Sequence, residues 1–137
     1  MEAKQWAKTV ALFDGFIFAT PEYNCSFPAS LKNAIDYLYR EWNDKAAGVV
    51  TYGRDGGIRA AEQLRLVLAE VKVATVRSQV SLSLFTDFTT LTDECTPGLR
   101  TTQALFNMMD ELIAWSTALA TLRVTLDRQP KPEPPQQ

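Results

Sequence analysis

The chain has 137 residues, of which 46% are hydrophobic and 22% are charged, with a formal net charge of -2 and no histidine. This length suits a single domain with its own core, and the composition excludes a fully disordered chain. Without an imidazole, the chain holds no Ser-His-Asp or Cys-His catalytic system and no histidine-based zinc site, so we expect no metal.

The charge balance and the number of cysteines exclude further classes of protein. A slightly acidic chain offers no basic face for nucleic acid, and no stretch approaches the ~20 apolar residues of a membrane span. Cys25 and Cys95 are too few for a disulfide framework. We expect a cytoplasmic protein with a small-molecule substrate, without nucleic-acid or membrane partners.

The first half of the chain predicts a helix end, a strand and a helix. Trp6, Val10 and Leu12 mark the end of a helix before residue 14. Residues 14–20 form a continuous apolar run ended by Pro21, which predicts a strand buried on both faces. Apolar positions at helical spacing then predict a helix over residues 28–42.

The second half repeats this alternation. Residues 46–52 predict a buried strand, 53–57 a glycine-rich turn and 58–71 a helix. In residues 74–84 apolar and polar side chains alternate, which predicts a strand with one exposed face at a sheet edge. Thr96 is expected to cap a last helix, with Pro97 at its first position. The packed side of that helix is expected to consist of Leu105, Met108, Met109, Leu112, Ile113, Ser116 and Leu119.

The domain is expected to span residues 1–128, followed by a disordered Pro-rich tail at residues 129–137. Strands that alternate with helices imply right-handed crossovers and a parallel sheet. In such sheets ligands bind beyond the carboxyl ends of the strands. Residues 20–27 and 52–57 both lie there, and they should sit side by side if their strands are neighbours.

The first of these loops presents an acid, a phenol and an amide in a short space. Pro21 fixes the turn after the strand, and Glu22 follows it. Tyr23 offers a flat ring and a hydroxyl donor, while Asn24 donates, accepts and tolerates left-handed geometry. The alternative interpretation of the loop is a capped connection into the next helix.

The second loop carries Gly53, Arg54, Asp55, Gly56 and Gly57. Glycine permits a positive φ and a close backbone approach to a ligand, and free N–H groups at a helix start favour anionic atoms. The loop lacks the lysine and Ser/Thr of a Walker phosphate loop and the full G-x-G-x-x-G spacing.

Longer stretches around both loops resemble a known family. The run Asp-Gly-Phe-Ile-Phe-Ala-Thr-Pro-Glu-Tyr-Asn at 14–24, followed by Ser-Phe-Pro-Ala-Ser-Leu-Lys-Asn-Ala-Ile-Asp at 26–36, is similar to the NAD(P)H-dependent FMN reductases of flavodoxin-like fold. Residues 52–65 resemble their second flavin-facing loop and its helix. The likeness runs in order from about Lys4 to Leu122, and Cys25 stands where these proteins usually have glycine.

The resemblance implies an α/β three-layer sandwich with a flavin at a dimer interface. Pro21, Glu22, Tyr23 and Asn24 would line the isoalloxazine, largely through backbone, and residues 53–57 would approach its pyrimidine side. A nicotinamide would pass a hydride to the flavin, so the cofactor carries the chemistry and histidine is not needed. If the protein itself acts as acid or base, the candidates are Glu22, Tyr23 and Asp55.

The chain departs from the family before residue 14. The family's first strand, first helix and second strand, with the loop that holds the FMN phosphate, have no counterpart in the 13 residues that precede Asp14. The expected fold is therefore a truncated flavodoxin-like sandwich of about three parallel strands. Its open apolar edge predicts a homodimer or a higher homo-oligomer, and the missing phosphate loop predicts weakened FMN affinity.

Two functions follow from these observations. The first is a flavin-dependent oxidoreductase that uses NAD(P)H to reduce FMN, a quinone or another small organic acceptor. The second is a cofactor-free relative that has lost FMN binding and acts as a small-molecule enzyme or as a binding or assembly partner. A colourless protein that ignores added FMN would exclude the first.

Overall fold

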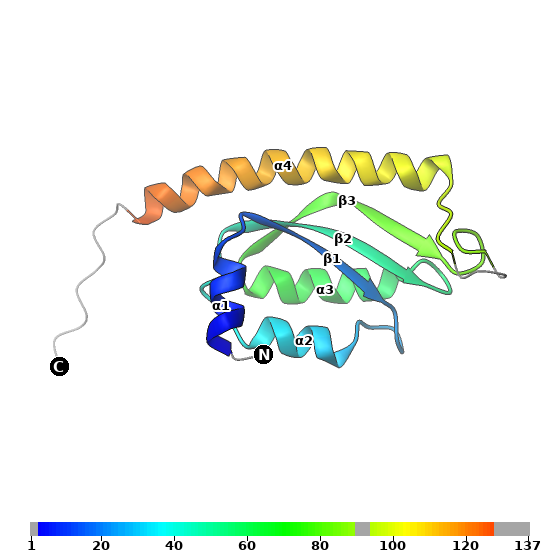
Figure 1. The fold of residues 1–137 in the computed structure, drawn as a ribbon, viewed down its shortest axis with the longest axis horizontal. Helices are drawn as coiled ribbons and strands as arrows, with labels where there is room; N and C mark the ends of the chain where they lie inside the picture. The colour runs from blue at the N-terminus through cyan, green and yellow to red at the C-terminus, as the bar shows by residue number, and fades with distance from the viewer. Residues whose placement is uncertain (1–2, 90–93, 128–137) are drawn as a thin grey trace.

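A computed structural model describes residues 3–89 and 94–127 and contains one parallel sheet between two layers of helices (Figure 1). The strands lie in the order β1-β2-β3, so each consecutive pair are neighbours. The elements in chain order are α1 (Ala3–Ala11), β1 (Gly15–Pro21), α2 (Ala29–Asp36), β2 (Lys45–Gly53), α3 (Ile58–Glu70), β3 (Val73–Ser83) and α4 (Leu99–Asp127). This is the α/β architecture of three parallel strands that the sequence predicts.

The main core lies between the sheet and the layer formed by α1, α2 and α3 (Figure 1). Trp42 fills its centre at 2% exposure, and its ring packs against Trp6, Phe16 and Phe18. Burying such large rings supplies much of the apolar area that stabilises the domain. The core therefore fixes β1 and β2, and with them the starting points of the loops at their carboxyl ends.

Helix α4 covers the other face of the sheet and, with 29 residues, extends beyond it (Figure 1). It is about 44 Å long at 1.5 Å per residue. Met108 packs directly over Gly48 of β2, where an added Cβ would lie 2.9 Å from the methionine sulfur. The small residue on β2 thus allows the helix to approach the sheet closely.

Strand β3 contains an irregularity that the sequence pattern does not reveal. Its pairing with β2 shifts between Ala47 and Val49, so that β3 carries extra residues at this point. Arg65 of α3 donates to the carbonyl of Val76 (2.9 Å), and Glu111 of α4 accepts from the Ser78 N–H (3.0 Å) on the other side. Two helices therefore hold this bulge from opposite faces.

The expectation that β3 has a solvent-exposed face is wrong. Only Arg77 is exposed within the strand, because α3 covers one face and α4 covers the other. The predicted helix over residues 28–42 is too long, since α2 ends at Asp36. Leu38 and Trp42 are nevertheless buried, which explains why the apolar spacing continues beyond the helix.

The last helix also differs from the expectation. It begins at Leu99 rather than after Thr96, and Thr96 donates its backbone N–H to the carbonyl of Asp87. Of the expected packed side only Met108 and Leu112 are buried, whereas Ile113 is 60% exposed. Leu12 lies beyond the end of α1 and is exposed. The expected tail at 129–137 lies outside the described residues.

Candidate functional site at the carboxyl ends of the strands

Three loops meet where the strand arrows end in Figure 1. The loop after β1 joins the end of β2 directly, because the Glu22 N–H donates to the carbonyl of Tyr52 at 2.9 Å. The loop after β3 joins the same segment, because the Leu84 N–H donates to the carbonyl of Gly53 at 3.0 Å. The prediction that residues 20–27 and 52–57 lie side by side is confirmed.

The first loop is closed by a tight two-residue turn. Tyr23 and Ser26 exchange both backbone hydrogen bonds, at 2.8 and 3.0 Å. The two residues between them, Asn24 and Cys25, have φ values of 50° and 66°. Two consecutive positive φ angles define a type I′ turn, for which Asn-Gly is the preferred pair. The turn leaves the Tyr23 ring 62% exposed at the surface of the loop.

Glu22 links this loop to the start of α3. Its carboxylate accepts from the backbone N–H groups of Arg59 (3.1 Å) and Ala60 (3.4 Å), and from the Arg59 guanidinium (2.7 Å). Arg59 also pairs with Asp55 at 3.3 Å. The hydrogen bond and charge of Glu22 raise the pKa of Arg59. A residue distant in sequence therefore supplies the N-terminal cap of α3.

The glycine-rich turn is shaped by Gly57, which has a φ of 70°. A Cβ at this position would lie 2.7 Å from the Cβ of Thr51, so only glycine fits without a shift. The Thr51 hydroxyl donates to the carbonyl of Gly56 at 2.8 Å and fixes the turn against β2. The backbone of residues 53–57 is thus rigid and close-packed.

In the third loop, sequence reasoning places Asp87 but misses its structural role. Asp87 is buried, and its carboxylate accepts from the Ser83 N–H (2.9 Å) and from the hydroxyls of Thr86 and Thr101. Burial alone would raise its pKa, but these hydrogen bonds, with one from the Gly98 backbone, outweigh burial and lower the pKa. An aspartate in a Ser/Thr-rich stretch was the available signal.

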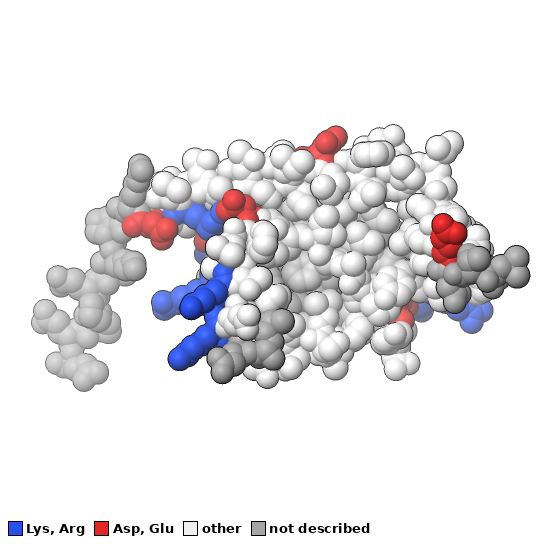
Figure 2. All heavy atoms as spheres, in the orientation of Figure 1, with Lys and Arg blue, Asp and Glu red and all other residues white. Residues whose placement is uncertain are grey.

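The residues expected to line a cofactor thus lie together at the carboxyl ends of the strands. Of the three acid–base candidates, Glu22 and Asp55 share Arg59 as their partner. The exposed Tyr23 lies in the turn that follows Glu22. Figure 2 shows charged side chains gathered toward the two ends of the strands, with a mostly uncharged surface between them.

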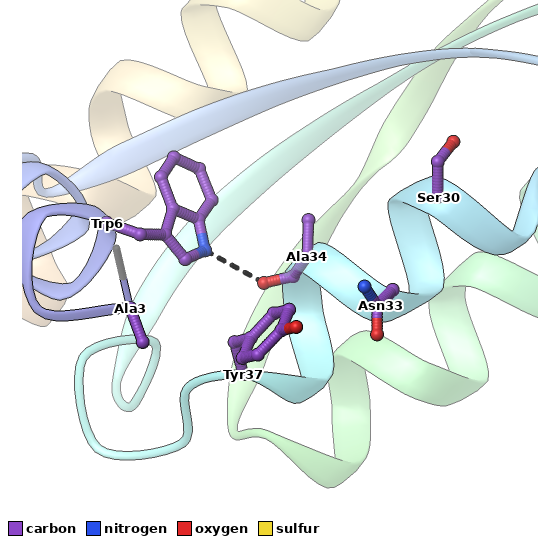
Figure 3. Close-up of a pocket in the computed structure, with 6 residues that line it drawn as sticks. All are labelled: Ala3, Trp6, Ser30, Asn33, Ala34 and Tyr37. Carbon is purple, nitrogen blue, oxygen red and sulfur yellow. Dashed lines mark hydrogen bonds between the residues drawn. The ribbon is translucent and has the colours of Figure 1, made fainter. Parts of the chain in front are cut away.

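A separate cavity of about 560 Å³ lies between α1 and α2 (Figure 3). The indole N–H of Trp6 donates across it to the carbonyl of Ala34 at 2.8 Å. None of the residues of the glycine-rich turn lines it. The lining residues are Ala3, Trp6, Ser30, Asn33, Ala34 and Tyr37.

Among residues 3–89 and 94–127, no group of three or more Cys, Asp or Glu side chains is arranged to hold a metal ion. Within the same residues, no helix has the length and apolar character needed to cross a membrane. Cys25 and Cys95 are both free and exposed.

Comparison with known proteins decides the family. The family model of the NADPH-dependent FMN reductases matches residues 1–87, which include β1, β2, β3 and the loops that follow β1 and β2. The chain belongs to this family. The match ends before α4, so the helix that covers the second face of the sheet lies outside it.

This chain matches only part of the length of its curated relatives. An NAD(P)H-dependent FMN reductase of Schizosaccharomyces pombe is 44% identical over 81 residues, which are 59% of this chain and 40% of that protein. An NAD(P)H:quinone oxidoreductase of Solanum tuberosum is 45% identical over 64 residues, 44% of this chain and 33% of that protein. The chain thus spans about two fifths or less of these curated relatives.

A solved structure extends the likeness to most of the chain. The flavoenzyme NAD(P)H:(acceptor) oxidoreductase FerB of Paracoccus denitrificans superposes with a TM-score of 0.68 at 23% sequence identity. The superposition covers 85% of this chain and 68% of FerB. The described residues therefore have the flavodoxin-like fold of this flavoenzyme.

Proposed function

We propose that the chain acts as a flavin-dependent oxidoreductase that takes electrons from NAD(P)H and reduces FMN, a quinone or another small organic acceptor. One observation supports the proposal most directly. Glu22 in the first loop accepts hydrogen bonds from Arg59 at the start of α3, and so fixes together the two loops that the family resemblance places against a flavin. The names of the relatives, FMN reductases and quinone oxidoreductases, support the same reaction class.

The ring of a flavin fits this edge better than its phosphate does. Residues 21–24 present backbone and the exposed Tyr23 ring, and the turn at Gly57 has no room for a side chain. By contrast, the N–H groups of Arg59 and Ala60, where a phosphate could be held, already donate to Glu22. Bound flavin would supply hydride transfer, while residues 21–24 and 53–57 orient the ring.

The second candidate is a relative that no longer binds a nucleotide. The observation that favours it is the same occupation of the α3 N-terminus by Glu22, which leaves those amides unavailable to a phosphate. In that case the edge would bind a small molecule or a partner directly, with Glu22, Tyr23 and Asp55 as the candidate acid–base groups.

A pair of titrations separates the two candidates. The purified chain is titrated with FMN and with riboflavin while flavin fluorescence is followed, and NADPH oxidation is then measured. Because the ring is held and the phosphate is not, we expect saturable binding of both flavins with affinities within about tenfold, far less than several charge-assisted phosphate bonds would produce. Absence of binding by either flavin refutes the oxidoreductase proposal.

We also propose that the chain works as a homodimer or higher homo-oligomer. Strand β1 is an edge of the described sheet, and its run Gly-Phe-Ile-Phe-Ala-Thr-Pro contains no charged residue that would block pairing. Ile17 is 46% exposed at this edge. Light scattering during size exclusion tests the proposal, and a concentration-independent monomer refutes it.

The free thiols of Cys25 and Cys95 support a reducing, cytoplasmic setting.

A further inference from the structure

Strand β1 has one face that the rest of the described chain leaves partly uncovered. Phe16 and Phe18 point into the main core, where their rings pack against Trp42. Side chains alternate along a strand, so Ile17 and Ala19 point to the opposite face of the sheet, on which α4 lies. Both residues are exposed. The free edge of β1 lies beside this open face, because β1 pairs only with β2 in the described sheet.

One flank of α4 adjoins the open face of β1. An added Cβ on Gly15 would collide with the Ser116 side chain, so this point of the helix lies over β1. Met109 and Ile113 precede Ser116 by seven and three positions and therefore lie on the same flank. Phe106 lies seven positions before Ile113, and both side chains are 60% exposed. We call the combined apolar area the β1–α4 surface; it consists of Ile17, Ala19, Phe106, Met109 and Ile113.

The opposite flank of α4 has no such neighbour. Glu111 accepts from the Ser78 N–H at 3.0 Å, which places this flank over β3. Trp115 lies four positions after Glu111 and is 46% exposed. Along β3, however, only Arg77 is exposed, so no exposed apolar residue of the strand continues this flank. Within the described residues, the apolar area therefore extends from helix to strand on the β1 side.

Charged side chains stay out of the β1–α4 surface. Residues 112–122 of α4 contain none, and β1 contains none. Asp110 lies two positions after the buried Met108, so it points away from the sheet. Figure 2 shows a mostly uncharged surface between the two ends of the strands. A charge or a bulge often protects an edge strand from pairing, and β1 has neither along Gly15–Pro21.

We propose that a second copy of this chain covers the β1–α4 surface. A two-fold axis normal to the sheet places the two β1 strands side by side and antiparallel, which joins two three-stranded sheets into one. The same axis places both α4 helices on one face of that sheet, with their apolar flanks toward each other. Each part of the surface thus meets its own copy, free edge against free edge and apolar flank against apolar flank. The inference rests on the proposed homo-oligomer and deepens it, because it names the surface and symmetry of the contact.

The dimensions of the chain fit this pairing. The seven residues of β1 extend about 23 Å, and the flank of α4 from Phe106 to Ala120 extends about 21 Å. Met108 packs over Gly48 of β2, so two α4 helices would be separated by three strand spacings, about 14 Å. Helices in direct contact lie about 8–10 Å apart, which leaves a gap of about 4–6 Å. Large side chains from both copies, Phe106, Ile113 and Ile17, fill such a gap.

The contact area reaches the range of specific dimers. The contact face is about 23 Å long and about 20 Å deep, because the sheet and the helix layer are each about 10 Å thick. Two such faces amount to about 900 Å² of flat area, and the accessible area of interlocking side chains is larger than the flat area. Specific interfaces begin at about 1,000–1,200 Å² of total accessible area. The pairing is therefore large enough to persist in solution.

Light scattering during size exclusion, over a range of concentrations, tests the contact in three proteins. We expect the wild type to elute with twice the chain mass of 15.3 kDa. Ile113→Glu places an unpaired charge in the contact from each copy, and should weaken the dimer at least about a hundredfold. Trp115→Glu is the matched control on the opposite flank, and should change the dissociation constant by less than about threefold.

Hydrogen exchange tests the strand pairing separately. The backbone amides of residues 15–21 should exchange more slowly as the wild-type dimer forms, because the free edge then donates to its copy. In Ile113→Glu their exchange should not depend on protein concentration. Ile17→Lys places a charge at the strand edge and should also give a monomer. It repeats the test from the strand if circular dichroism shows that Ile113→Glu does not fold.

The outcomes separate this contact from the other proposals. A wild-type chain that remains monomeric overturns both the contact and the homo-oligomer. An oligomer that tolerates Ile113→Glu and Ile17→Lys, or that Trp115→Glu weakens equally, overturns only the contact. An oligomer that leaves residues 15–21 unprotected overturns the joined sheet and with it the contact. Flavin titration of the same samples is read independently, so a dimer that binds no flavin supports the contact and refutes the oxidoreductase.

Discussion

The turn at Asn24 and Cys25 provides a sharp test of how the first loop is built. Both residues have positive φ, and a cysteine pays a steric penalty there because its Cβ approaches the backbone carbonyl. Cys25→Gly removes that Cβ while the Tyr23–Ser26 hydrogen bonds that define the turn remain. We therefore expect this substitution to stabilise the protein, although glycine usually weakens ordered segments.

The expected gain follows from two opposing effects. Relief of the left-handed conformation at one residue contributes about 1–2 kcal/mol. The greater freedom of glycine in the unfolded chain costs about 0.4–1 kcal/mol. The net stabilisation is about 0.5–1 kcal/mol, which for a chain of this length corresponds to a rise in Tm of about 2–4 °C.

Urea and thermal unfolding of three variants measure this gain. Cys25→Ala removes the thiol but keeps the Cβ, so it should gain nothing at the same position. Cys95→Ala controls for the loss of an exposed thiol elsewhere in the chain. If Cys25→Gly is no more stable than Cys25→Ala, the assignment of strain to this turn is wrong.

Substitutions at three further positions test the loops at the carboxyl ends of the strands. Gly57→Ala forces a Cβ to within 2.7 Å of Thr51 in a left-handed conformation, and should cost about 2–4 kcal/mol in urea unfolding; a loss below about 1 kcal/mol contradicts the close packing. Glu22→Gln keeps one cap acceptor, whereas Glu22→Ala removes the cap and should cost about 0.5–2 kcal/mol, so equal stability of these two variants argues against capping. Asp87 has a lowered pKa when folded, so its contribution is present above the unfolded pKa of about 3.9 and is lost as the pH falls below that value. The gap in urea midpoint between wild type and Asp87→Asn should therefore shrink as the pH falls below about 4, and a constant gap would exclude a charged Asp87 as its source.

The strands and the loops at residues 20–27 and 52–57 could be predicted because their signals are local. Continuous apolar runs before Pro21 and before Gly53 indicate buried strands, and alternation with helices places both runs in one parallel sheet. The neighbouring positions of the loops then follow from strand order alone. Two short apolar runs were therefore enough to predict that these loops lie side by side at the carboxyl ends of the strands.

The contacts that depend on distant residues could not be predicted in the same way. Glu22 caps a helix that begins 36 residues later, and no spacing rule connects the two. Asp87 holds the segment before α4, because its carboxylate accepts from the Gly98 backbone and from the Thr101 hydroxyl. The bulge in β3 depends on Arg65 and Glu111, which come from helices on opposite faces of the sheet. Each of these needs the tertiary fold before the side chain has a partner.

Glu22 shows how the two proposed functions differ in physical terms. A carboxylate in a candidate cofactor-binding loop suggests acid–base chemistry, yet here it satisfies two helix amides and a guanidinium, with a side-chain exposure of 9%. The same bonds hold the loops at a fixed distance, which a bound ring requires, and occupy two amides at the start of α3 that could otherwise attract an anion. Recognition at this edge should therefore depend on the ring of the ligand far more than on its phosphate.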